Sequence, residues 1–135
     1  MLYLNPSNIS DLLTVTLYEK CNNILNPYFT WKLTNKNTSE EVIFYQDDSS
    51  TSPYYYNSFT VSVVNTGMSL TSGVINVNYG EYEYEIYEKS TPRELTILLN
   101  DNLVESGLLI VLTDSTISSY FTGSDSDTTR TFLNL

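Results

Sequence analysis

Histidine and alanine are missing from this sequence of 135 residues, and cysteine occurs only once, at Cys21. Without histidine there is no imidazole base, so Ser-His-Asp and Cys-His mechanisms are excluded, as are zinc sites built on histidine and cysteine. Without alanine, the best helix former, a helical bundle is not expected. A single cysteine cannot form a disulfide within the chain, which agrees with assembly in a reducing cytoplasm.

Positive charge is also scarce, because six lysines and arginines face sixteen acids and give a formal net charge of −10. The basic residues are scattered, whereas a nucleic-acid-binding surface needs a clustered basic footprint. We therefore predict no direct contact with nucleic acid and interpret the acidity as solubility, with a basic partner surface or cation binding as the alternative. No run reaches the roughly 18 apolar residues of a membrane span, and residues 1–6 do not resemble a secretory signal.

Small polar residues and tyrosine are abundant: there are 17 threonines, 17 serines, 14 asparagines and 12 tyrosines. Apolar side chains alternate with polar ones in many places, which is the period of a strand with one buried face. Seven such segments, with turn residues about every ten positions, predict an all-β domain folded as a β-sandwich. The predicted strands are 13–17, 29–34, 41–46, 55–64, 70–77, 81–86 and 107–113, with a long connection over 89–102.

The alternation is clearest after Tyr79. Gly80 opens this segment, and Tyr82, Tyr84 and Ile86 follow at two-residue spacing, so the intervening glutamates face water or a neighbouring subunit. The pattern G-x-Y-x-Y-x-I resembles the penultimate strand of immunoglobulin-like and fibronectin-like domains, where a tyrosine near the strand start hydrogen-bonds back across a corner. Tyr82 is the candidate for this bond, ahead of Tyr79. We predict an immunoglobulin-like β-sandwich without a disulfide, and an ordinary meander or barrel strand is the alternative.

The sequence changes character at Asp114. Residues 114–135 are rich in serine, threonine and aspartate and cannot bury enough apolar area by themselves to offset the entropy of ordering. Two interpretations stay open, a frayed tail or an arm that becomes ordered on a neighbouring subunit. The predicted organisation is a sandwich over 1–113 followed by this arm or flexible tail. Candidate anchors of the arm are Tyr120, Phe121, Phe132 and Leu133.

No arrangement of residues predicts catalysis, a cofactor or a metal site. Glycine motifs that cradle phosphate are absent. The acids lie mainly on the outward face of one strand or in polar loops, which does not favour a glycosidase with paired carboxylates. Asp47–Asp48 and Asp125–Asp127 could offer oxygen ligands to calcium, but the EF-hand pattern is missing and solvation explains them.

A run of three tyrosines, Tyr54, Tyr55 and Tyr56, follows Pro53 directly. Exposed tyrosines could stack on sugars or anchor an interface. In a strand, however, alternate tyrosines would face opposite sides, and one or two would pack in the core or at an edge. Packing is the simpler interpretation, and all three residues are retained as interface candidates.

Two stretches resemble a known family: Tyr79–Glu88 reads YGEYEYEIYE, and Asn102–Val111 reads NLVESGLLIV. They are similar to small virion proteins of tailed phages that infect Bacteroidota, including crAss-like phages. In that family a G-x-Y-x-Y-x-I-Y-E strand precedes a G-x-V-E-x-G-x-x-x-V-like strand, whose leading glycine is absent here. Residues 13–18 and 26–29 also resemble the family, so the resemblance covers roughly residues 10–113.

The resemblance implies a non-enzymatic virion structural protein, a capsid auxiliary (decoration) protein that docks on the major capsid shell. Its implied partners in a multi-copy assembly are the major capsid protein, neighbouring virion proteins and a head-fibre protein. Such proteins are made in the host's bacterial cytoplasm and reside on the capsid surface. The alternative is a head-fibre or tail adaptor that binds host surface glycans through the tyrosine run, and a glycan-degrading enzyme is the least favoured hypothesis.

Overall fold

The computed structural model describes residues 1–22 and 27–112, which form eight strands and one short 3-10 helix. The elements are β1 (Leu2–Leu4), β2 (Asp11–Val15), η1 (Tyr18–Lys20), β3 (Tyr28–Asn35), β4 (Glu41–Tyr45), β5 (Asn57–Val63), β6 (Val74–Ile75), β7 (Gly80–Lys89) and β8 (Asn102–Val111). The predicted all-β class is confirmed. Over the same residues, no helix has the length and apolar character needed to span a membrane.

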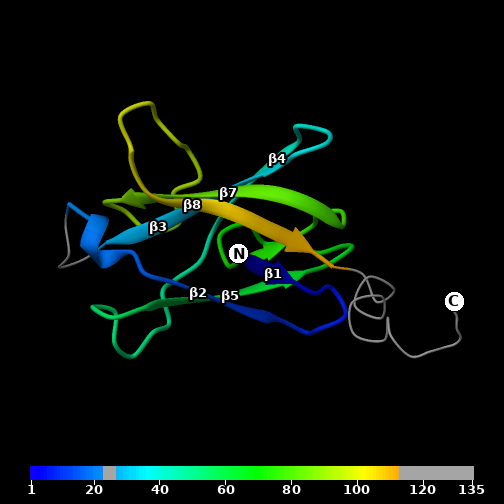
Figure 1. The fold of residues 1–135 in the computed structure, drawn as a ribbon, viewed down its shortest axis with the longest axis horizontal. Helices are drawn as coiled ribbons and strands as arrows, with labels where there is room; N and C mark the ends of the chain where they lie inside the picture. The colour runs from blue at the N-terminus through cyan, green and yellow to red at the C-terminus, as the bar shows by residue number, and fades with distance from the viewer. Residues whose placement is uncertain (23–26, 113–135) are drawn as a thin grey trace, which may run out of the picture.

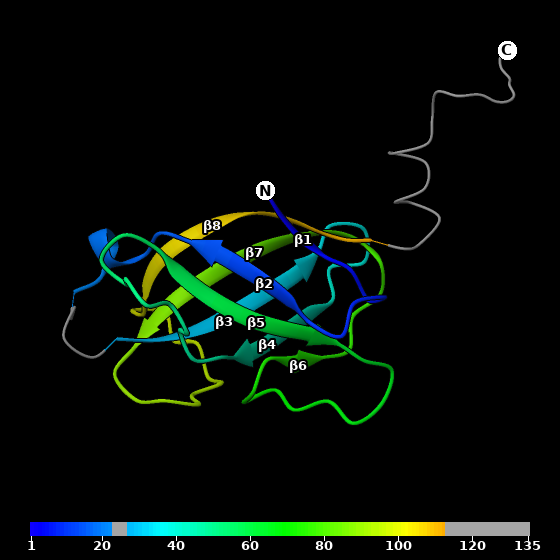
Figure 2. The same cartoon turned by 90° about the horizontal axis from the view of Figure 1, so that it is seen from below.

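The strands form two sheets that pack face to face (Figure 1 and Figure 2). The larger sheet has the order β1-β8-β7-β3-β4, and the smaller has the order β2-β5-β6. Most neighbouring strands are antiparallel, but β1 pairs with β8 and β5 with β6 in parallel. Cys21 is a free thiol. The predicted β-sandwich without a disulfide is therefore confirmed.

The core lies between the sheets and is built around aromatic rings from both. Phe29 and Trp31 of β3 meet Phe59 of β5 edge to face, with ring centroids 5.8 and 5.3 Å apart. All three side chains are at most 1% exposed. Burying each such side chain contributes roughly 1.5–3 kcal/mol, so this contact is a main link between the two sheets.

The alternation predicted for β7 is observed. Tyr82, Tyr84 and Ile86 are 3%, 4% and 0% exposed and face the core, while the glutamates between them face outward. The Tyr82 hydroxyl donates a hydrogen bond to the Asn78 carbonyl oxygen at 2.9 Å, which confirms the bond predicted for this tyrosine. Tyr79 precedes the strand and is 70% exposed.

The immunoglobulin-like assignment stays a prediction, and two observations support it. In the larger sheet β7 lies between β3 and β8, while β2 pairs with β5 in the smaller sheet. The same neighbours occur in immunoglobulin-like sandwiches, where the penultimate strand lies between the last strand and the third. The bond of Tyr82 at the start of β7 is the second observation.

The strands predicted over 70–77 and 107–113 differ most in extent from the observed ones, and one strand has no predicted counterpart. The strand predicted over 70–77 is reduced to Val74–Ile75, because Gly73 has a φ of 71° and closes a turn. The strand predicted over 107–113 begins five residues earlier, at Asn102, and the register of its pairing with β7 shifts at a β-bulge between Ile86 and Tyr87. β1 was not predicted, because three residues are too few to show a period.

Candidate interaction surface

Three connections meet at one end of the sandwich, which we call the loop end: residues 16–22, 46–56 and 90–101. β2 ends where β5 begins, because Val15 pairs with Asn57. β7 ends where β3 begins, because Lys89 pairs with Tyr28. Figure 1 shows these connections together on the left of the molecule, and Figure 2 agrees. Side chains from distant parts of the sequence therefore share one surface.

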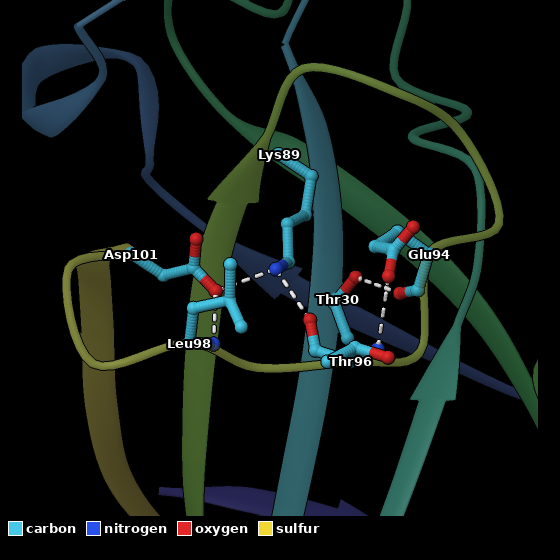
Figure 3. Close-up of polar contacts among 6 residues, drawn as sticks. All are labelled: Thr30, Lys89, Glu94, Thr96, Leu98 and Asp101. Atoms are coloured by element: carbon cyan, nitrogen blue, oxygen red, sulfur yellow. Dashed lines mark hydrogen bonds and ion pairs between the residues drawn. The ribbon is translucent and has the colours of Figure 1, made fainter.

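An ion pair closes the neck of the loop 90–101 (Figure 3). Lys89 Nζ lies 2.5 Å from Asp101 Oδ2, and the two side chains are only 7% and 15% exposed. The ammonium also donates to the Thr96 carbonyl oxygen at 2.5 Å, and the Leu98 amide donates to Asp101 Oδ2 at 2.6 Å. Burial acts to raise the pKa of Asp101, but the Leu98 amide and the Lys89 ammonium outweigh it and hold that pKa below 3.8. The loop backbone is thus fixed near both of its ends.

A second contact holds the middle of this loop against β3. The Thr30 hydroxyl donates to the Glu94 carbonyl oxygen at 2.5 Å, and Thr30 is fully buried. Thr30 pairs with Tyr45 of β4, and both residues are buried. Phe44, the residue before Tyr45, belongs to the core between the sheets, so Tyr45 lies on the opposite, outer face of the larger sheet. The loop therefore covers this part of the outer face of the larger sheet. This explains why β4 carries apolar side chains on both of its faces.

The far side of the loop presents two leucines to solvent. Leu98 and Leu99 are 57% and 109% exposed. A single exposed leucine is ordinary on a protein surface. Two adjacent leucines on a backbone held by hydrogen bonds offer a compact apolar contact that loses little conformational entropy when a partner binds.

The loop 46–56 is held by one carboxylate rather than by an ion pair. Asp48 accepts hydrogen bonds from the Ser50 amide at 2.9 Å, the Ser58 amide at 3.0 Å and the Asn57 side-chain amide at 2.6 Å. These bonds join the start of the loop to the first residues of β5. Asp48 is therefore a structural group of the loop end.

The tyrosine run lies in this loop, before β5 begins. Tyr54, Tyr55 and Tyr56 are 64%, 82% and 36% exposed. The ring of Tyr54 meets the ring of Tyr18 edge to face, with centroids 5.4 Å apart, and the Tyr56 hydroxyl lies 3.2 Å from Thr51 Oγ1. Packing of the run in a strand, the simpler interpretation, is therefore wrong. The three tyrosines are exposed side chains of the loop end.

The lone thiol is a poor candidate for chemistry. Cys21 is half-buried, and its Sγ donates to the Leu17 carbonyl oxygen at 3.4 Å. Burial, followed by the nearby Glu88 carboxylate, raises the pKa of the Cys21 thiol to about 12. Because the thiolate is the reactive form, this environment keeps Cys21 inert near neutral pH.

The other residues singled out in the sequence are possible metal ligands, residues of β7 and residues outside the described ranges. Within residues 1–22 and 27–112, no three acidic or cysteine side chains cluster as a metal ion would need. The large residues of the G-x-Y-x-Y-x-I pattern, Tyr82, Tyr84 and Ile86, pack in the core. Candidates outside the described residues are Tyr120, Phe121, Phe132, Leu133 and Asp125–Asp127, with the predicted arm over 114–135.

The sequence patterns did not predict the exposed pair Leu98 and Leu99 or the ion pair that holds their loop. Leu98 and Leu99 were recognised only as part of a long connection. A usable signal was present, because Lys89 and Asp101 lie at the two ends of the connection and an apolar stretch that includes Leu98 and Leu99 interrupts its polar run. Pairing of those flanking charges is a tertiary contact, and no local pattern encodes it.

Comparison with known proteins identifies no relative: no protein-family model, curated protein or solved structure gives a significant match. The chemistry of the loop end must therefore be inferred from its own residues. Two loops, each held by its own polar contacts, present five large apolar or aromatic side chains at one end of a rigid sandwich. Such an arrangement suits binding to another macromolecule.

Proposed function

We propose that this protein is a non-enzymatic structural component of a phage virion, a capsid auxiliary protein docked on the major capsid shell. Its partners are the major capsid protein and neighbouring virion proteins, with a head-fibre protein as a further one. It is made in the host's bacterial cytoplasm and resides on the capsid surface. The resemblance of β7 and β8 to small virion proteins motivates this proposal, and the loop end supplies a physical means of docking.

The observation that carries docking is the exposure of Leu98 and Leu99, in a loop at the same end of the sandwich as the tyrosine run. Interface hot spots are rich in tyrosine and lie where large side chains enter pockets of the partner. A contact made by pre-ordered loops loses less entropy on binding than one made by a flexible segment. The formal charge of −10 adds a constraint, since the partner surface must be neutral or basic to avoid repulsion.

The test is quantitative mass spectrometry of purified particles of the phage that encodes the chain. The double variant Leu98→Ser/Leu99→Ser should fall at least tenfold in copies per particle. Leu12→Ser is the matched control, because Leu12 is 62% exposed on β2, away from the loop end. Both variants change only exposed side chains, so circular dichroism should show an unchanged fold.

Absence of the unmodified protein from purified particles would overturn the virion function itself. Full incorporation of the double variant would overturn docking through the leucines and leave the virion function standing. Removal of residues 114–135 examines the predicted arm separately, because normal incorporation of that truncated chain would overturn the arm hypothesis.

The exposure of the tyrosine run favours a second candidate function, a head-fibre or tail adaptor that binds host surface glycans. Tyr54 and Tyr55 are 64% and 82% exposed, as rings that stack on sugars must be. A glycan array with the unmodified protein and Tyr55→Ala tests it. Binding that the substitution removes supports this function, and a silent array overturns it.

A further inference from the structure

A hollow of about 280 Å³ lies at the loop end, beside the tyrosine run. Its wall is formed by residues from four segments: Tyr18 of η1, Tyr28 of β3, Tyr45 of β4, and Asp47, Asp48 and Ser50 of the loop 46–56. We call it the tyrosine hollow. Binding sites for drug-sized molecules are usually about 300–1,000 Å³, so this hollow suits a ligand with a single ring.

Three tyrosine rings give the hollow its apolar wall. Tyr18 and Tyr28 are half-buried, and each therefore presents part of its ring to the space. Tyr45 is 1% exposed and is fixed by its hydroxyl, which donates to Asp47 Oδ1 at 2.5 Å. Among the described residues, the hydroxyls of Tyr18 and Tyr28 take part in no hydrogen bond.

The polar wall has capacity for hydrogen bonds that the protein does not use. Asp47 is exposed, and only its Oδ1 accepts a bond from the described residues. Ser50 Oγ is shielded from solvent and has no partner in the described part of the chain, a state that costs about 1–3 kcal/mol. Asp48 differs, because both of its oxygens accept bonds that hold the loop.

This combination selects the chemical class of the ligand. An anion would meet two carboxylates at close range and be repelled. A wholly apolar ligand would bury Asp47 Oδ2 without a hydrogen-bond donor, which is costly. A neutral sugar ring satisfies both walls, because its C–H face packs on an aromatic ring and its hydroxyls donate to the carboxylate.

We propose that the tyrosine hollow is a binding subsite for one neutral sugar ring, with Asp47 accepting its hydroxyls and Tyr18 and Tyr28 packing against it. The subsite does not depend on capsid docking, and it differs from the second candidate function in placing the sugar in the hollow instead of on Tyr54 and Tyr55. A wider depression of about 490 Å³ beside the loop 90–101 has no aromatic lining, so it lacks this chemistry.

The experiment is saturation-transfer NMR of the full chain with glucose, galactose, mannose and N-acetylglucosamine, each supplied alone as a monosaccharide. At least one sugar should receive saturation at its ring protons. Asp47→Ala should weaken binding at least tenfold, and Asp47→Asn, which keeps one acceptor oxygen, should restore part of it. Tyr55→Ala is the matched control, because Tyr55 is 82% exposed and does not line the hollow.

Each other outcome would overturn the subsite. If none of the four sugars receives saturation, a neutral sugar is not the ligand. If Asp47→Ala binds as tightly as the unmodified protein, the sugar does not bind in the tyrosine hollow. Loss of binding in Tyr55→Ala alone assigns the sugar to the tyrosine run. A preference for ethanolamine over every sugar assigns the hollow to a cation. Unchanged methyl signals of the core leucines show that each variant is folded.

Discussion

The loops 46–56 and 90–101 lie at the same end of the sandwich but are held in different ways. In the first, Asp48 accepts three hydrogen bonds from uncharged donors. In the second, Lys89 and Asp101 form an ion pair that is nearly excluded from solvent. The first loop presents tyrosines beside a hollow, and the second presents two exposed leucines.

Two loops with similarly exposed side chains can therefore differ in how much a single substitution lowers the free energy of unfolding. Removing one member of a buried ion pair leaves the other charge without compensation, which destabilises a protein more than losing hydrogen bonds between a carboxylate and neutral donors. The loop 90–101 should therefore respond more strongly to a single substitution than the loop 46–56. Its stability should also depend on pH, because the ion pair lowers the pKa of Asp101.

The largest effect is expected from Asp101→Asn, which leaves the Lys89 ammonium buried without its counterion. We expect the free energy of unfolding to fall by about 3 kcal/mol in a denaturant titration. The double variant Lys89→Met/Asp101→Leu is the control, since it buries no unpaired charge and should lose much less. A loss as large in the double variant would show that the loop depends on shape rather than on charge.

Asp48→Ala should have a smaller effect, because it removes an acceptor from three neutral donors. We expect a loss of about 2 kcal/mol, with faster hydrogen exchange at the Ser50 and Ser58 amides. Asp47→Ala is the neighbouring control, because Asp47 is exposed and accepts only the Tyr45 hydroxyl among the described residues. A loss that exceeds that of Asp101→Asn would reverse the comparison between the loops.

The smallest effect is the dependence of stability on pH. In the folded protein the pKa of Asp101 lies below its unfolded value of 3.8, so ionised Asp101 adds stability above that pH. This contribution is lost as the pH falls through the folded pKa. The difference in stability between the unmodified protein and Asp101→Asn should be constant between about pH 5 and 7 and shrink below about pH 4. A difference that stays constant down to pH 2 would contradict the lowered pKa.

Sequence patterns predicted the fold well where a strand has one buried face and enough length. β7 is ten residues long and alternates throughout, so its inward side chains and the bond of Tyr82 could both be predicted. β1 could not be, because three residues show no period and their parallel partner lies near the other end of the described chain. The turn at Gly73 shortened β6, since a positive φ is invisible to hydrophobic periodicity.

The surface was harder to predict for a physical reason. Whether Tyr54 to Tyr56 pack or protrude depends on where β5 begins, and a turn closed by the Tyr55 amide and the Ser52 carbonyl oxygen places that start at Asn57. The tyrosine hollow joins Tyr18, Tyr28 and Asp47, which come from three separate segments. Only the tertiary fold brings these groups together, so the residue types were visible and their proximity was not.

The short strand β1 has a consequence for how the chain folds. Leu2 pairs with Leu109, so this strand can take its place only after nearly all of the sandwich has been synthesised. Contacts between residues so far apart in sequence make β-sandwiches slow folders, over milliseconds to seconds. Until β1 docks, the edge of the apolar strand β8 is open to pairing with another chain. The three residues of β1 thus protect this edge of β8 against aggregation. Their removal should first lower the yield of soluble protein.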